Sequence, residues 1–274
     1  DKRTSIHVEF PEPIHSMYEN QQEVYDVIED NCIINAVPGW GKTFTALHLA
    51  KKLGQKTLII VHTVFLRDQW KNSIKDLFGI DCGIIGSGMM NYEGHAITVA
   101  NVQTLNKHLN KLAKEFGMVV VDEAHHCPST TFTTTINNFH ARYKIGLSGT
   151  LSRKDGKQIL FKDCFGTNVV LTKGENRMVP SVKVIQSEFA TDASLGWADR
   201  VTGLLSNTNY QNFISDLAHV FMADGHCVLI LGDRVEFLDN LGTIIGDKCV
   251  VITGKTKDRE AIVDKTLAGD FDCI

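Results

Sequence analysis

Residues 33–43, which read IINAVPGWGKT, combine the groups that phosphate binding requires. Gly39 and Gly41 allow backbone N–H groups to turn inward around an anion, and a helical pattern that starts after them adds the positive end of a helix. At this spacing we expect Lys42 to reach the β- and γ-phosphates of a nucleotide, and the hydroxyl of Thr43 to ligate Mg²⁺.

Three other residues of this loop modify that interpretation. Ala36 stands where such loops usually carry their first glycine, so an ordinary strand-to-helix turn is the alternative. Pro38 leads into the glycines and belongs to the predicted nucleotide-binding set. Trp40 replaces a small residue, and its indole either covers the nucleotide or packs on a neighbouring loop.

A pair of carboxylates completes the predicted chemistry. The stretch 118–126, MVVVDEAHH, reads as a buried parallel strand that ends in Asp122 and Glu123. Asp122 suits a role at Mg²⁺, directly or through water, because hard cations prefer oxygen ligands. Glu123 is the candidate to orient or deprotonate the attacking water, and Lys42 is the third predicted catalytic residue. A solvated acidic turn is the alternative, but together with the phosphate loop the pair indicates a nucleoside triphosphate site.

These residues depend on alternating strands and helices for their positions. Helical patterns occupy 43–53 and 66–78, and short apolar runs typical of strands occupy 32–37, 57–62, 97–102, 118–122 and 144–148. This alternation predicts an α/β fold, a parallel sheet covered on both faces. The motif residues fall at or just past the carboxyl ends of strands, where such sheets bind ligands.

The chain changes character after about residue 165. Residues 165–189 read as a connecting strand and an inter-domain linker, with glycines and Pro180. A helix-rich stretch from about residue 195 leads to the apolar runs 227–231 and 248–253, the expected opening strands of a second sheet. We therefore predict a first domain over 1–170, a linker over 171–194 and the start of a second domain over 195–274.

Several motifs, in order, resemble those of superfamily 2 helicases and translocases. The run 122–125 is the DEAH form of motif II. Residues 61–70 are similar to motif Ia and residues 97–105 to the strand-and-threonine motif that follows it. Residues 147–150 are similar to motif III and residues 227–241 to motif IV. The run 146–156, GLSGTLSRKDG, is similar to the branch that contains XPB, UvsW-like phage helicases and their poxvirus counterparts. The resemblance implies a RecA-like ATP-binding domain followed by an incomplete second RecA-like domain.

The same resemblance implies roles for residues at the matching positions. ATP and Mg²⁺ are the expected cofactors, and Gln21 stands where this branch carries its adenine-reading glutamine. Coupling of the γ-phosphate state to domain closure is expected of His125, Ser148, Gly149 and Thr150. Contacts to nucleic acid are expected of His62, Thr63, Gln103, Thr104 and Arg153.

The end of the sequence departs from the family pattern. Residues 267–274 resemble the strand that leads into motif V, and motif VI, which supplies the arginine finger, lies beyond them. Such a finger is worth about 10³–10⁵ in rate in related phosphate chemistry. We therefore expect the chain to be a fragment of a longer protein that binds ATP but hydrolyses it weakly.

Composition excludes several other classes. Hydrophobic residues make up 43% and charged residues 22%, as in globular proteins, and neither a membrane-spanning run nor a signal-peptide core is visible. Seven cysteines without a Cys-x-x-Cys pair indicate reduced, buried thiols and a cytoplasmic setting, which is the host cytoplasm if the protein is phage-encoded. A zinc site at Cys127, with His125 and His126, is a poor alternative because no second cluster accompanies it.

Charge does not by itself indicate a nucleic-acid partner, because the net charge is −4. Basic residues nevertheless follow the candidate contact motifs in three sets, at 67–75, 107–114 and 153–157, of which the first two equally fit a solvated helix face. The resemblance favours branched or single-stranded DNA as the partner, in repair, recombination or replication, and no membrane or secreted partner. An RNA helicase is one alternative, and a nucleotide-gated binding module without productive turnover is another.

Overall fold

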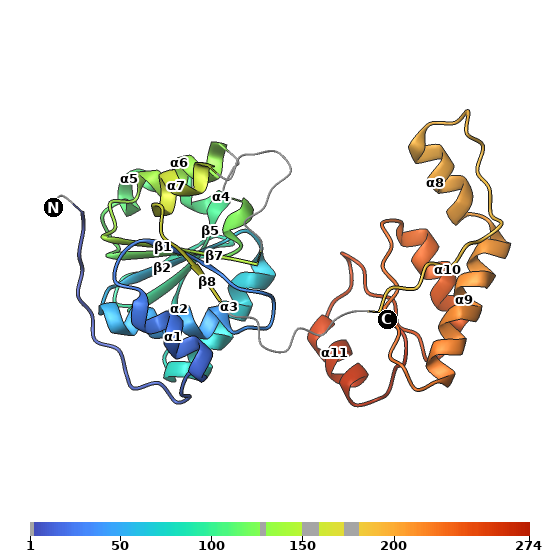
Figure 1. The fold of residues 1–274 in the computed structure, drawn as a ribbon, viewed down its shortest axis with the longest axis horizontal. Helices are drawn as coiled ribbons and strands as arrows, with labels where there is room; N and C mark the ends of the chain where they lie inside the picture. Colours follow the sequence, from blue (N-terminus) through green and yellow to red (C-terminus); the bar gives the residue numbers. More distant parts are fainter. Residues whose placement is uncertain (1–2, 127–129, 150–158, 173–180) are drawn as a thin grey trace. The chain divides into compact units, whose positions relative to one another are not determined.

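The computed structural model describes residues 3–126, 130–149, 159–172 and 181–274 (Figure 1). The chain divides into two compact units, Asp1–Val179 and Pro180–Ile274, and each is described here by itself. The division falls inside the segment predicted as a linker, and Thr150 and Arg153 lie outside the described residues.

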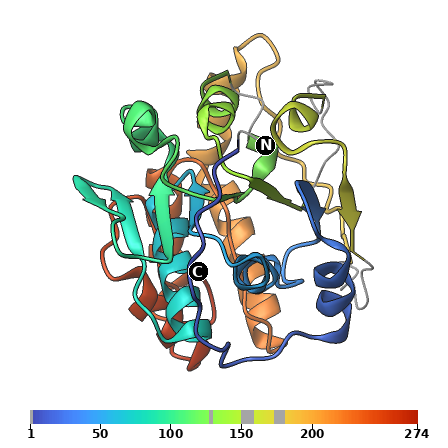
Figure 2. The same ribbon diagram turned by 90° about the vertical axis from the view of Figure 1, so that its left-hand side faces the viewer.

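An eight-stranded sheet forms the centre of the first unit. Its strand order is β4-β3-β5-β2-β6-β7-β1-β8, and every neighbouring pair is parallel except β3 with β4. Figure 2 shows β4 and β8 at opposite ends of this sheet. The strands are β1 Cys32–Asn35, β2 Thr57–Val61, β3 Gly83–Gly86, β4 Met89–Asn91, β5 Ile97–Asn101, β6 Met118–Val121, β7 Tyr143–Ser148 and β8 Val169–Leu171. All five strands predicted from the sequence are confirmed to within two residues at each end.

Helices cover both faces of the sheet (Figure 1). One face carries α1 Glu19–Val27, α2 Lys42–Leu53 and α3 Val64–Phe78. The other carries α4 Val102–Leu105, α5 Leu109–Leu112, α6 Thr130–Asn138 and α7 Ile159–Phe165, and a 3₁₀ turn, Ala124–His126, follows β6. The predicted helices 43–53 and 66–78 correspond to α2 and α3.

Strand β2 shows how the sequence builds the two cores. Successive side chains of a strand point to opposite faces, so Ile59 and Val61 pack into the core under α1–α3 while Leu58 and Ile60 pack into the core under α4–α7. All five residues of this strand are buried. A parallel strand covered on both faces needs such a continuous apolar run, which is why it is recognisable in the sequence.

The second unit contains four helices in its described part: α8 Trp197–Leu205, α9 Thr208–Ala223, α10 Val235–Ile245 and α11 Arg259–Leu267. The expected strands at 227–231 and 248–253 are not formed there as regular strands. Isolated parallel bridges instead join Cys273 to Val228 and to Cys249. Backbone hydrogen bonds join Val228 to Asp272 and Ile274, and Val250 to Cys273, so the residues 272–274 lie between the two apolar runs.

Cysteine burial differs from the sequence expectation at two of the described positions. No described cysteine forms a disulfide, and Cys32, Cys82, Cys164 and Cys273 are buried. Cys227 is exposed and Cys249 is half-buried. Among the helices described, none is long and apolar enough to cross a membrane.

Two matched substitutions test the placement of the strands. Leu58 is fully buried in β2, whereas Leu171 on the edge strand β8 is 69% exposed. Leu58→Ala should lower the free energy of unfolding of the first unit by about 2–5 kcal/mol, because it leaves a cavity in the core. Leu171→Ala should change it by less than about 0.5 kcal/mol. Urea unfolding followed by circular dichroism measures both, and equal effects would contradict the topology.

Candidate nucleotide site

The phosphate loop connects the end of β1 to the start of α2. Gly39 and Gly41 have φ values of 79° and 95°, in the left-handed region that a residue with a side chain rarely adopts. Gly41 is the residue before α2, and Lys42 and Thr43 are the first two residues of that helix. The loop therefore has the glycine-dependent turn and the helix N-terminus that the sequence predicts.

The side chain of Lys42 folds back into this loop. Its Nζ donates to the carbonyl oxygen of Ala36 at 2.8 Å and to that of Val37 at 3.5 Å. These carbonyls hold the ammonium group over the loop, where a phosphate needs a cation. The backbone N–H of Ala36 donates to the carbonyl of Ser148 at 3.0 Å, which ties the loop to the end of β7.

Asp122 directly follows β6 and is 8% exposed. Its Oδ2 accepts a hydrogen bond from Trp70 Nε1 at 2.8 Å, and its Oδ1 accepts from the backbone N–H of Glu123 at 2.9 Å. Burial raises the pKa of the Asp122 carboxyl above its usual range, and the charge of Glu123 adds to this. The hydrogen bonds from Trp70 and from the backbone N–H of Glu123, and the charge of Lys42, lower the pKa in part. A nearby cation would stabilise the charged form of this buried carboxylate, as a role in metal binding requires.

Glu123 has a φ of 49°, which is uncommon for a residue with a side chain. Its Oε2 lies 3.1 Å from Nδ1 of His125, and that nitrogen lies 3.4 Å from the hydroxyl of Ser148. Backbone strain of this kind clusters at functional sites. The contacts bring together the predicted water-handling residue and two of the predicted coupling residues.

Gly149 lies against the phosphate loop. A Cβ built on it would be 3.6 Å from Cδ of Pro38 and 3.8 Å from Nζ of Lys42. The segment predicted as motif III therefore touches the loop, although its last predicted residue, Thr150, lies outside the described part.

Gln21, on helix α1, lies beside the phosphate loop. It is 4% exposed, its Nε2 donates to the carbonyl of Trp40 at 3.0 Å, and its Oε1 accepts from the backbone N–H of Tyr18 at 3.1 Å. A pocket of about 470 Å³ opens here, lined by Ile14, His15, Ser16, Tyr18, Gln21, Phe44 and His48. The indole of Trp40 is buried in the core under α1–α3, so it packs rather than lies open to a ligand.

The predicted nucleic-acid contacts lie at the ends of β2 and β5. His62 and Thr63 follow β2, and Gln103 and Thr104 lie in α4, directly after β5. Gln103 Nε2 donates to the carbonyl of His62 at 3.4 Å, so the structure brings these two segments together. Thr63 caps α3 by accepting from the N–H of Leu66 at 3.2 Å.

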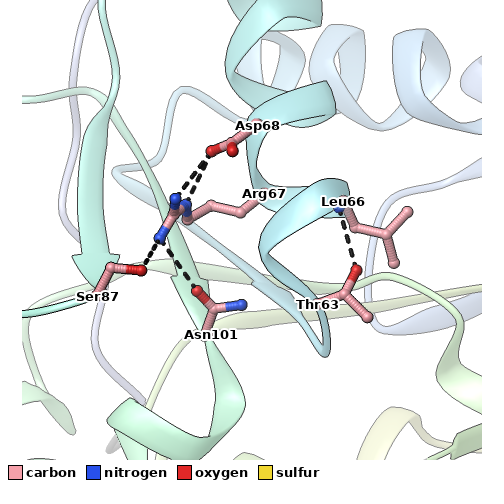
Figure 3. Close-up of polar contacts among 6 residues, drawn as sticks. All are labelled: Thr63, Leu66, Arg67, Asp68, Ser87 and Asn101. Atoms are coloured by element: carbon pink, nitrogen blue, oxygen red, sulfur yellow. Dashed lines mark hydrogen bonds and ion pairs between the residues drawn. The ribbon is translucent and has the colours of Figure 1, made fainter. Parts of the chain in front are cut away.

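Arg67 differs from the expectation for the basic set at 67–75. It is 6% exposed, so it belongs neither to a solvated helix face nor to an open basic surface. Its guanidinium donates to Asp68 at 3.0 Å, to the Ser87 hydroxyl at 2.9 Å and to Asn101 Oδ1 at 3.5 Å (Figure 3). Arg67 therefore joins α3 to the β3–β4 turn and to the end of β5.

Sequence reasoning missed Trp70 and most of the pocket beside Gln21. Trp70 lies 52 residues from its partner Asp122, and no local pattern relates the two. Ile14, Tyr18 and Phe44 read as ordinary apolar or turn residues. Within the described residues no group of three or more His, Cys, Asp or Glu could hold a metal, while Cys127 of the zinc alternative lies outside them.

Fold and loop geometry together define an α/β domain of the phosphate-loop class. A family model described as "Type III restriction enzyme, res subunit" matches residues 14–153, just over half of the chain. The chain belongs to this family, and with it to the ATP-dependent helicases of superfamily 2.

Relatives with assigned names agree with this placement. "Probable helicase D10" of Escherichia phage T5 is 43% identical over 244 residues, which cover 88% of this chain and 54% of the relative. "Putative ATP-dependent RNA helicase L396" of Acanthamoeba polyphaga mimivirus is 28% identical over 82% of this chain and 42% of its own length. "DNA 3'-5' translocase XPB2" of Sulfurisphaera tokodaii is 35% identical over 48% of this chain and 30% of its own length. The chain thus spans about half the length of the first of these relatives, and less of the others.

The fold is also similar to solved helicase cores. The SWI2/SNF2 ATPase core of Sulfolobus solfataricus, solved with double-stranded DNA, matches with a TM-score of 0.52 at 11% identity, over 94% of this chain and 77% of that one. This likeness confirms the predicted RecA-like fold class.

Two glycine substitutions test the geometry of the loop. A Cβ on Gly41 would lie 2.2 Å from Nε2 of Gln21, and its φ of 95° disfavours any side chain. Gly41→Ala should therefore strain the loop by about 1–3 kcal/mol and weaken ADP binding at least about tenfold. Gly149→Ala should preserve binding, because its Cβ meets only ordinary contacts, the nearest at 3.6 Å. Titration with a fluorescent ADP measures both, and equal affinities would contradict the loop geometry.

Proposed function

We propose that this chain is the ATP-binding part of a DNA helicase or translocase that acts on branched or partly single-stranded DNA. The observation that carries the proposal is that Lys42, Asp122 and Glu123 meet at one edge of the sheet in a member of the superfamily 2 helicases. Related proteins of a phage and a virus support a setting in the cytoplasm of a host cell.

The phosphates of ATP would bind in the loop 36–41 and the adenine in the pocket beside Gln21. Inward-facing N–H groups and the N-terminus of α2 favour the anionic phosphates, and Lys42 would exchange its carbonyl partners for phosphate oxygens. Phe44 and Tyr18 offer aromatic surface for the base. The amide of Gln21 keeps one N–H and one lone pair beyond its present bonds, so it can still read the polar edge of adenine.

Thr43 and Asp122 are the residues that would hold Mg²⁺. Their oxygens suit a hard cation, and the Asp122 carboxylate is already oriented by two donors. Bound Mg²⁺ would neutralise charge on the phosphates as the γ-phosphoryl group is transferred.

Glu123 would orient the attacking water and accept its proton. Phosphoryl transfer depends mainly on positioning and charge neutralisation, so a carboxylate held by His125 and a lysine in the loop supply much of what the reaction needs. Ser148 contacts both His125 and, through its carbonyl, the loop at Ala36. This arrangement supports a coupling role for Ser148, Gly149 and Thr150.

Nucleic acid would contact the ends of β2 and β5. His62, Thr63, Gln103 and Thr104 cluster there, beside the N-terminus of α3, and Arg153 is the further predicted contact. Contacts of backbone amides, hydroxyls and helix N-termini go mainly to phosphates and do not read sequence. Recognition would therefore depend on the structure of the strands.

RNA is the second candidate substrate, because one relative is named as an RNA helicase. The similarity of run 146–156 to the XPB and UvsW branch, and the relative named as a DNA translocase, favour DNA. Stimulation of ATPase activity by forked DNA, single-stranded DNA and single-stranded RNA in competition distinguishes the two. A preference for RNA would replace the DNA proposal.

Lys42→Ala tests nucleotide chemistry. The substitution removes the cation of the phosphate loop, so the ATPase activity of the full-length protein should be abolished while its circular dichroism stays native. Lys265→Ala, which changes an exposed lysine outside the candidate contact sets, is the matched control and should keep its activity. Normal turnover in the folded Lys42→Ala protein would refute the assignment.

Glu123→Gln separates binding from hydrolysis. The glutamine cannot accept the proton of water, so turnover should fall by about 10²–10⁴-fold while Mg²⁺-dependent ATP binding remains. Glu93→Gln changes an exposed glutamate and serves as the control. Loss of ATP affinity with unchanged turnover at saturation would contradict the role.

A further inference from the structure

Trp70 connects helix α3 to the carboxylate of Asp122. The indole is 1% exposed, and its Nε1 donates to Oδ2 of Asp122 at 2.8 Å. The ring packs in the same core as Ile74 and Leu77, which follow it on α3. An indole fixed by packing has little freedom, so its N–H defines a fixed point for the carboxylate oxygen.

The indole is also chemically suited to orient a metal ligand. It donates one hydrogen bond, carries no charge and accepts none, so it leaves the negative charge of Asp122 available to a cation. The second oxygen accepts from the N–H of Glu123, so two donors from different segments fix the plane of the carboxylate. Partners of this kind orient metal ligands in many sites.

Polar contacts also hold the N-terminal part of helix α3, ahead of Trp70, in place. Thr63 caps its N-terminus, and Arg67, three residues before Trp70, bonds to Ser87 and Asn101 (Figure 3). Gly86 is required beside this cluster, because a Cβ there would lie 2.5 Å from Oδ1 of Asn101. The position of the Trp70 donor is therefore set by the packing and polar contacts of the whole helix.

We propose that Trp70 is a positioning residue that orients Asp122 for Mg²⁺ binding through its indole N–H. The proposal rests on the proposed function, in which Asp122 is a Mg²⁺ ligand. Without the N–H the Asp122 side chain rotates away or loses its fixed plane, and Mg²⁺ binds more weakly to the nucleotide complex. The phosphate loop does not contain Trp70, so binding of ADP without Mg²⁺ stays unchanged.

The test compares three variants of the whole chain: Trp70→Phe, Asp122→Asn, and Trp197→Phe, which changes a tryptophan that is 77% exposed. Binding of fluorescent ADP is titrated with and without Mg²⁺. In Trp70→Phe, the Mg²⁺ concentration at which ADP binding is half-maximally strengthened should rise about 10–100-fold, and the affinity for ADP without Mg²⁺ should stay unchanged. Trp197→Phe should match the parent chain. A general structural defect would lower both affinities.

The outcomes separate the two proposals. If ADP binding by Asp122→Asn depends on Mg²⁺ as in the parent chain, Asp122 is not a metal ligand, and the function proposed for that residue is wrong. A changed dependence in Asp122→Asn but not in folded Trp70→Phe would overturn the inference on Trp70 alone.

A second measurement remains decisive if phenylalanine disturbs folding. Replacing Trp70 with benzothienylalanine keeps the bicyclic shape and puts a sulfur, which cannot donate a hydrogen bond, in place of the N–H, and it should reproduce the weakened Mg²⁺ dependence. In the parent chain, the three tryptophans give three indole ¹H–¹⁵N signals. The Trp70 signal should shift in Asp122→Asn and on addition of Mg²⁺ with ADP, while that of Trp197 stays in place. Parent-like Mg²⁺ dependence of the benzothienylalanine protein would overturn the proposal.

Discussion

The site depends on one constraint, the adjacency of parallel strands β6, β7 and β1. Because neighbouring parallel strands end at the same edge of a sheet, Asp122 after β6, Ser148 at the end of β7 and the phosphate loop after β1 must lie together. The backbone bond from Ala36 to Ser148 and the contact of Ser148 with His125 follow from this order. Segments far apart in the sequence thereby form one small polar region at the carboxyl edge of the sheet.

Helix α3 links this region to the neighbouring ends of β2 and β5. Its N-terminus follows His62 and Thr63, Arg67 ties its first turn to Asn101, and Trp70 reaches the carboxylate of Asp122. Helix α3 therefore contacts both the candidate residues for nucleic-acid binding and the candidate metal ligand. A buried arginine and a buried indole stabilise that helix by hydrogen bonds that would be costly to leave unmade.

Much of the first unit could be predicted from the sequence, because buried parallel strands are continuous apolar runs and the phosphate loop needs glycines at fixed places. Strands such as 57–62 and the position of Lys42 at the start of a helix follow from local patterns. The Trp70–Asp122 bond and the burial of Arg67 could not, since both depend on which distant segments the sheet order brings together. The second unit departed most from the prediction: its apolar runs at 227–231 and 248–253 form isolated bridges to Cys273 in place of regular strands, a pairing that depends on distant segments and has no local pattern.

In the proposed site, the loop 36–43 and Asp122 together would bind Mg²⁺ and nucleotide. The most direct measurement is a crystal structure of the chain with Mg²⁺ and a non-hydrolysable ATP analogue. We expect Nζ of Lys42 to leave the carbonyl of Ala36 for a phosphate oxygen, with Mg²⁺ bound by Thr43 and, directly or through water, by Asp122. A nucleotide bound elsewhere, or a Lys42 that keeps its bond to Ala36 while the nucleotide is present, would contradict the account.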